Sequence, residues 1–219
     1  MAQTNEHGRI IAAAAKAALA PIGCVRKGQS RIWRSDQRYW VIDVEFQPSG
    51  WQKGSYLNIF VAWLWNVNDS YNFSYRAGFF IAFENAEQFT PPMKELAAIA
   101  AAEVLKVRKK FGSFSDISDH IKANNRRAAW PGFDAAIACG LAGDVVSARQ
   151  YFDEVATWNT KTNPWRIRAK KDTAALVALL EHPQEFRAAV LEYVAQRRQL
   201  MHLPLDPHCL DELGSTAGP

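Results

Sequence analysis

The sequence predicts an α+β fold in which an N-terminal helix packs on an antiparallel sheet of about four strands, followed by an all-helical region. Two observations support this prediction. Residues 1–90 contain segments in which apolar and polar residues alternate with period two between turn residues, which is typical of antiparallel strands. From residue 91 onward the chain is rich in Ala, Leu and Lys, which favour helices. We therefore expect the helix and sheet in residues 1–90, the helical region in 91–202 and a tail over 203–219.

The first helix should span residues 4–20, because Pro21 and Gly23 end it. Its Ala-rich face would allow close packing against a sheet. Within residues 40–47, four large apolar side chains alternate with Val41, Asp43, Glu45 and Gln47, so this segment predicts a strand with one polar face. The other strands are expected at residues 31–34, 56–66 and 78–83.

The helical region should begin at Pro91 and Pro92, because proline is tolerated in the first turn of a helix. Gly112 should end this first helix, over residues 93–111. The Gly143-Asp144 pair predicts a tight turn with Asp144 as an N-cap, and therefore an αα-hairpin. The remaining helices are expected at 133–141, 145–156, 173–180 and 183–200.

Charge and cysteine usage exclude several classes. The net charge of +4 is spread evenly, with +2 in residues 1–90 and +2 in residues 91–219, so it permits a nucleic-acid partner without requiring one. Cys24, Cys139 and Cys209 form no paired motif, which indicates reduced thiols in a soluble, cytoplasmic protein. The sequence has no Gly-rich phosphate loop, no dinucleotide fingerprint, no His-rich helix and no stretch long enough to cross a membrane. We expect no cofactor and no membrane partner.

Asp43, Glu45 and Gln47 would share one face of their strand, with neighbouring side chains about 7 Å apart. Asp36 could add a third carboxylate. This arrangement resembles the carboxylate core of restriction-type nucleases, in which hard oxygen ligands hold Mg²⁺, with Gln47 where a Lys is expected. The alternative is a solvated strand face, since antiparallel strands commonly place polar residues on one side.

Asn58 stands among apolar residues in the strand at 56–66 and needs hydrogen-bond partners if it is buried. It could bond to the loop at Gln47–Ser49 and stabilise the hairpin, or it could form a small polar binding site with that loop.

Trp51 lies between Gly50 and Gly54 in a loop, so we expect it on a contact surface, whereas the tryptophans on strands should be core residues. Arg126 and Arg127 form a short basic cluster before Trp130. Arg and aromatic residues dominate many interfaces. We therefore expect a partner to bind around Trp51, Arg126, Arg127 and Trp130, where the sheet and the helices meet.

A set of short motifs covers about residues 5–115: Leu19-x-Pro21-x-Gly23-x-x-Arg26-Lys27-Gly28, then Trp33, Gln47-x-Ser49 and Tyr56-Leu57-Asn58. This set resembles a bacterial family known only as a domain of unknown function. In that family an N-terminal helix leads into a sheet that carries the Gln-x-Ser motif and a strand with an Asn. The resemblance implies the architecture and no catalytic residue.

Two functions from different classes remain. The first is a non-catalytic bacterial interaction module, with a protein as its partner, in a defence or toxin-neutralising system. The second is a metal-dependent nuclease or nucleic-acid processing domain that uses Asp43 and Glu45, with Asp36 and Gln47, to hold Mg²⁺. The lack of a recognisable catalytic constellation favours the first.

Overall fold

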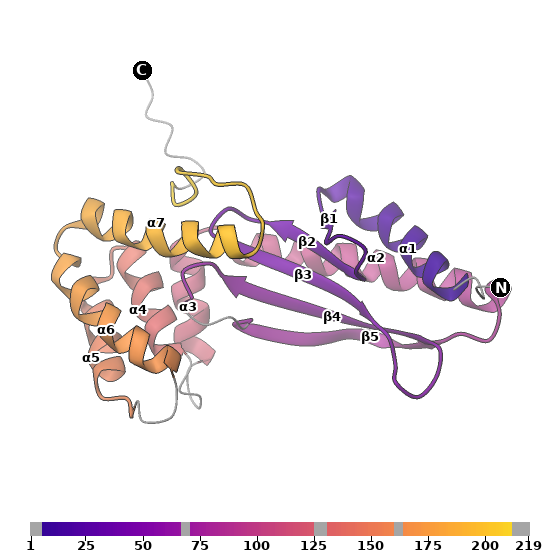
Figure 1. The fold of residues 1–219 in the computed structure, drawn as a ribbon, viewed down its shortest axis with the longest axis horizontal. Helices are drawn as coiled ribbons and strands as arrows, with labels where there is room; N and C mark the ends of the chain where they lie inside the picture. The colour runs from indigo at the N-terminus through magenta and orange to yellow at the C-terminus, as the bar shows by residue number, and fades with distance from the viewer. Residues whose placement is uncertain (1–5, 67–70, 125–130, 160–163, 212–219) are drawn as a thin grey trace, which may run out of the picture. The chain divides into compact units, whose positions relative to one another are not determined.

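The computed structural model describes residues 6–66, 71–124, 131–159 and 164–211, and it confirms the α+β class (Figure 1). The chain divides into two compact units. Unit 1 comprises Met1–Ala62 and Tyr71–Lys109, and unit 2 comprises Trp63–Ser70 and Lys110–Pro219. In the described part of the chain, no helix is long and apolar enough to cross a membrane.

Unit 1 contains a five-stranded antiparallel sheet in which each strand pairs with the next along the chain. The sequence predicted about four strands. The additional strand, β1, has only two residues, and Val25 pairs with Arg34 of β2. A two-residue strand is too short for alternation to reveal it. The strands are β1 (Val25–Arg26), β2 (Ile32–Asp36), β3 (Trp40–Gln47), β4 (Gly54–Trp63) and β5 (Phe73–Ala82).

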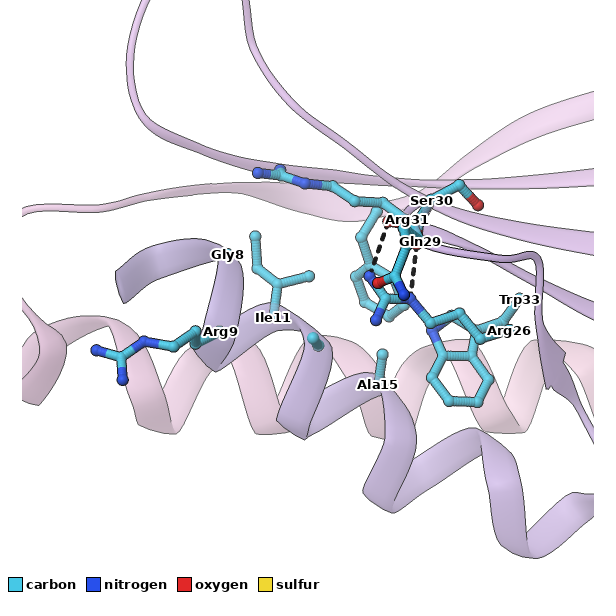
Figure 2. A pocket seen from close by; sticks show the side chains of 11 residues that line it. Gly8, Arg9, Ile11, Ala15, Arg26, Gln29, Ser30, Arg31 and Trp33 are labelled. Carbon is cyan, nitrogen blue, oxygen red and sulfur yellow. Dashed lines mark hydrogen bonds between the residues drawn. The ribbon is translucent and has the colours of Figure 1, made fainter. Parts of the chain in front are cut away.

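Helix α1 (Glu6–Leu19) ends where the sequence predicts. A short 3₁₀ helix (Ala20–Ile22) follows it, and Gly23 adopts the left-handed conformation, with φ of 78°, that closes this turn. Ile11 and Ala15 of α1 line one cavity together with Trp33 of β2 (Figure 2). Helix α1 therefore covers the part of the sheet formed by β2 and β3.

Helix α2 (Ala86–Lys110) covers the same face of the sheet. Arg108 donates hydrogen bonds to the hydroxyl of Ser35 in β2, and the Tyr75 hydroxyl of β5 donates to Glu103 at 2.8 Å. This face carries the apolar side chains of the sheet, which are buried: Trp33, Ile42, Val44, Phe46, Leu57, Ile59 and Val61.

The start of α2 was predicted wrongly, because the helix begins at Ala86 and not near Met93. The Asn85 side chain accepts a hydrogen bond from the Gln88 amide at 2.9 Å, so the N-cap lies upstream of the prolines. Pro91 and Pro92 lie inside the helix. Prolines near a helix start therefore mark it only to within about two turns.

Unit 2 is helical. The αα-hairpin is confirmed, and the Asp144 carboxylate accepts a hydrogen bond from the Ser147 amide at 3.0 Å, as an N-cap does. Helix α3 was not predicted. A reciprocal cap precedes it, in which the Ser113 amide donates to the Asp116 carboxylate and the Asp116 amide donates to the Ser113 hydroxyl. The helix predicted at 173 starts at Pro164 instead. The helices are α3 (Phe114–Asn124), α4 (Pro131–Leu141), α5 (Val145–Ala156), α6 (Pro164–Leu179) and α7 (Pro183–Leu200).

Candidate functional site

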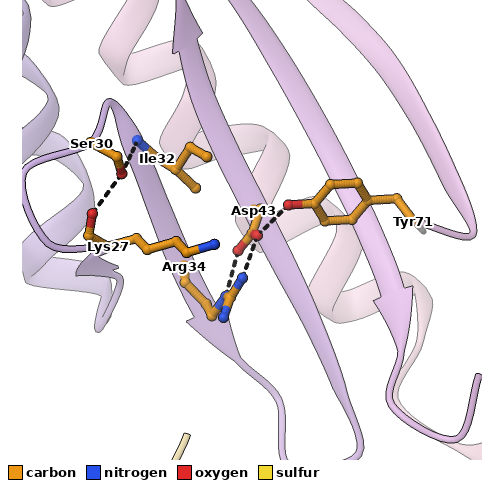
Figure 3. A network of polar contacts seen from close by, with 6 residues as sticks. All are labelled: Lys27, Ser30, Ile32, Arg34, Asp43 and Tyr71. Atoms are coloured by element: carbon orange, nitrogen blue, oxygen red, sulfur yellow. Dashed lines mark hydrogen bonds and ion pairs between the residues drawn. The ribbon is translucent and has the colours of Figure 1, made fainter. Parts of the chain in front are cut away.

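Asp43 lies on the sheet face opposite α1 and α2, and both of its carboxylate oxygens are occupied (Figure 3). The Arg34 Nε donates to Oδ1 at 2.7 Å, and Arg34 Nη2 donates to Oδ2 at 2.6 Å. The Tyr71 hydroxyl also donates to Oδ2, at 2.6 Å. Asp43 is 0% exposed and Arg34 7%, so these two form a buried ion pair. With the half-buried Tyr71 they make up what we call the buried cluster, which joins β2, β3 and the segment before β5.

The electrostatics of this cluster favour the ion pair. Burial lowers the pKa of Arg34, but the hydrogen bond and charge of Asp43 outweigh burial and raise the pKa overall. Burial and the charge of Asp43 also raise the pKa of Tyr71, which keeps this hydroxyl protonated as a donor. A metal ion at Asp43 would have to displace two donors that already satisfy the carboxylate.

Glu45 and Gln47 have different partners from Asp43. The Asn58 side-chain amide donates to Gln47 Oε1 at 2.8 Å and to Glu45 Oε2 at 3.2 Å, so the predicted contact between Asn58 and Gln47 is confirmed. Arg76, opposite Asn58 in β5, donates to Gln47 Oε1 at 3.4 Å. Its guanidinium lies 3.9 Å from the centre of the Tyr56 ring. We call Glu45, Gln47, Tyr56, Asn58 and Arg76 the polar strip. Its members are half-buried except for the exposed Arg76.

The four residues of the nuclease hypothesis are therefore not brought together as one ligand set. Asp43 belongs to the buried cluster and Glu45 and Gln47 belong to the polar strip. Asp36 is exposed and accepts a hydrogen bond from the Arg38 amide at 2.9 Å, within the turn that joins β2 to β3. Among the described residues, no group of three His, Cys, Asp or Glu side chains could hold a metal ion.

Trp51 lies in the loop that joins β3 to β4, and it is 99% exposed. Its amide donates to the Ser49 hydroxyl at 3.1 Å, so the loop has local structure. The tryptophans on strands are core residues, as predicted: Trp33, Trp40 and Trp63 are buried. Arg126, Arg127 and Trp130 lie outside the described residues.

Three partners in this region were not predicted: Arg34, Tyr71 and Arg76. Arg34 could have been found, because a tight hairpin between residues 31–34 and 40–47 pairs it with Asp43. Arg76 faces Asn58 directly across β4 and β5, but the predicted strand began at residue 78 and so excluded it. Tyr71 precedes β5, and no local pattern marks it.

Comparisons of the chain with family models, with curated proteins and with solved structures give no match. The resemblance of residues 5–115 to a family of unknown function therefore stays a prediction.

Proposed function

We propose that the protein is a non-catalytic module that binds a protein partner through Trp51 and the polar strip. The observation that carries this proposal is the exposure of Trp51, a large aromatic side chain that buries none of its surface although it belongs to a loop with local structure. Gln47, the last residue of β3, leads directly into this loop, so the strip and the indole belong to one end of the hairpin formed by β3 and β4.

The chemistry of the strip fits a protein better than a polyanion. It carries one carboxylate, Glu45, one guanidinium, Arg76, and two side-chain amides, so its formal charge is zero. The amides of Gln47 and Asn58 can exchange their mutual hydrogen bonds for bonds to a partner's main chain. Trp, Tyr and Arg are the side chains that most often contribute strongly to protein interfaces.

The occupied carboxylate of Asp43 favours this function over the nuclease. A metal-dependent hydrolase needs carboxylate oxygens that are free to bind the cation. Asp43 already accepts three hydrogen bonds, and Glu45 accepts one from Asn58.

The test replaces Trp51 by a photo-crosslinking amino acid and identifies the protein captured in cells of the source organism. The affinity for that protein is then measured with the Trp51→Ala/Arg76→Ala variant and with the control Val146→Ser, an exposed apolar position of unit 2. We expect at least a tenfold loss for the first variant and none for the control. Equal affinities for both variants would refute the proposal. Mg²⁺-dependent cleavage of nucleic acid that disappears in Glu45→Gln would support the nuclease instead.

A further inference from the structure

Strand β5 forms one edge of the sheet in unit 1, and no other strand among the described residues pairs with its outer side (Figure 1). It has ten residues, whereas β1, at the other edge, has only two. In the described part of the chain, the main chain of residues 74–81 forms hydrogen bonds only within the sheet. Every second residue of an edge strand directs its N–H and C=O groups away from the sheet. The outer side of β5 is therefore a row of main-chain donors and acceptors that another strand can pair with.

The sequence of β5 lacks the residues that usually keep an edge strand from pairing. It contains no Pro, no Lys and no acidic residue, and Arg76 is its single charged residue. The opposite edge is protected by the short length of β1. Within β5 the regular pairing with β4 is interrupted at Gly78, which has a φ of 66°. This interruption leaves the five residues 73–77 in regular register, which is long enough for an added strand.

Two exposed side chains of β5 indicate what an added strand would carry. Phe79 follows the interruption and is 65% exposed, although it is a large apolar side chain. Arg76 is also exposed, and no carboxylate among the described residues forms an ion pair with it. Its guanidinium donates to the side-chain oxygens of Asn58 and Gln47, both at 3.4 Å. The edge therefore presents a positive charge and an apolar side chain beside its main-chain groups.

Charge distinguishes the two kinds of strand that could pair with this edge. A second copy of β5 would add a second Arg76 and no carboxylate, so the like charges would stay unbalanced. A segment of another protein with Asp or Glu opposite Arg76 would balance this charge, and an apolar side chain of that segment would cover Phe79. The charges therefore favour a segment of a partner over a second copy of this chain.

We propose that the protein partner adds an extended segment to the outer edge of β5, with an acidic side chain on Arg76 and an apolar side chain on Phe79. Main-chain hydrogen bonds would supply the affinity of this pairing, and the two side-chain contacts its specificity. The inference rests on the proposed function for the identity of the partner. Arg76 belongs both to the polar strip and to β5, so the strip and this edge are adjacent.

A library of linear peptides of twelve residues, displayed on phage and selected on the full chain, tests the proposal. We expect the enriched peptides to contain Asp or Glu together with apolar residues. In synthetic copies of one such peptide, methylation of the main-chain nitrogen should weaken binding about tenfold at every second residue and little at the residues between, because a paired strand directs only alternate N–H groups toward its neighbour. On binding, the amides of residues 73–82 should exchange their hydrogens more slowly, and those of α5 should not.

Variants of the protein test the two side-chain contacts. Phe79→Ser and Arg76→Gln should each weaken peptide binding by at least about fivefold, because one removes an apolar contact and the other an ion pair. The matched control is Val25→Ser, which changes a 70% exposed apolar residue at the other edge of the same sheet and should bind as the wild type does. All three positions are exposed, so the variants should keep the thermal unfolding temperature of the wild type.

Several results would overturn the proposal. These are a selection that enriches no peptide, methylation effects that do not alternate, and a loss of binding in Val25→Ser as large as that in Phe79→Ser. Protection of the β5 amides in the free chain that grows with its concentration would also overturn it, because a second copy then occupies the edge. A protein captured through Trp51 that leaves the exchange of β5 unchanged would overturn the strand pairing and leave the proposed function intact. If no protein is captured at Trp51 but the peptides bind as expected, the proposed function fails and the pairing edge stands.

Discussion

Replacing Asp43 by Asn keeps the shape of the side chain and removes the charge that Arg34 and Tyr71 both contact. In the wild type the Arg34 guanidinium is buried and makes two hydrogen bonds to this carboxylate, at 2.7 and 2.6 Å. In Asp43→Asn the positive charge stays buried without a counter-charge, and one of its two donors meets an amide NH₂ group. The structure therefore predicts a large loss of stability in unit 1.

The magnitude follows from the geometry. Removing one partner of a buried ion pair typically costs about 3–5 kcal/mol, and the near-complete burial of both groups places this pair in that range. Tyr71→Phe removes only the hydroxyl that donates to Oδ2, so its cost should be about 1.5–3 kcal/mol, as for a hydrogen bond to a charged group. The double variant Arg34→Met/Asp43→Leu should be more stable than Asp43→Asn, because it leaves no unpaired charge, although the Tyr71 hydroxyl still loses its acceptor.

The assay is urea unfolding combined with hydrogen exchange of the β2 and β3 amides, which reports on unit 1 directly. Asp36→Asn is the matched control, since it changes an exposed carboxylate at the end of β2 and should alter stability by less than about 0.5 kcal/mol. A loss of less than about 1 kcal/mol in Asp43→Asn, or a double variant that is less stable than Asp43→Asn, would refute this prediction.

Three further predictions follow from other parts of the chain. Hydrogen bonds from Lys122 and from Ser147 lower the pKa of Asp144 from 3.8 to about 2, so its stabilising contribution is complete above pH 4 and is lost as the pH falls toward 2; urea midpoints should show a shallower loss in Asp144→Asn. Gly140→Ala should lose about 1–3 kcal/mol in thermal unfolding, because its Cβ would lie 2.6 Å from the Phe186 ring. Trp51→Phe should remove the tryptophan emission that acrylamide quenches most readily, because this indole is 99% exposed.

Each of these has a control. Asp153→Asn, which changes an exposed carboxylate of α5, should leave the acid dependence unchanged, and an effect equal to that of Asp144→Asn would contradict the role of the Asp144 cap. Gly50→Ala should leave the stability nearly unchanged, because no atom lies within 4 Å of its added Cβ. A loss of stability as large as that of Gly140→Ala would indicate an effect on the denatured state and not on packing in the folded state. Trp33→Phe should leave the quenchable emission in place.

The sequence was sufficient for the fold class, the sheet faces and most helices, because these depend on hydrophobic periodicity. Within residues 40–47 the alternation assigns each side chain to one face, and the structure has the same assignment. The start of α2 depends on a local cap at Asn85, which the nearby prolines obscured. The two residues of β1 exist as a strand only because Val25 and Arg26 pair with β2, which is a tertiary effect.

The candidate site was predicted in part. Alternation placed Asp43 and Glu45 on one face, and the contact between Asn58 and Gln47 was found as an interaction across the hairpin. Alternation does not determine which groups on neighbouring strands face a carboxylate. Two carboxylates two residues apart were therefore read as a possible pair of metal ligands, although each has its own partner: Arg34 for Asp43 and Asn58 for Glu45.

Register explains the opposite environments of two arginines only three residues apart. In the hairpin of β2 and β3, Arg34 pairs with Asp43, whereas the Arg31 carbonyl accepts from the Phe46 amide at 3.1 Å, so Arg31 faces an apolar residue. A shift of the register by one residue would place Ile42 or Val44 opposite Arg34 and leave its charge unpaired. The same pairing that neutralises Arg34 thus places Arg31 on the opposite face of the sheet, where its guanidinium Nη2 donates to Nε2 of His7 in α1 at 3.2 Å.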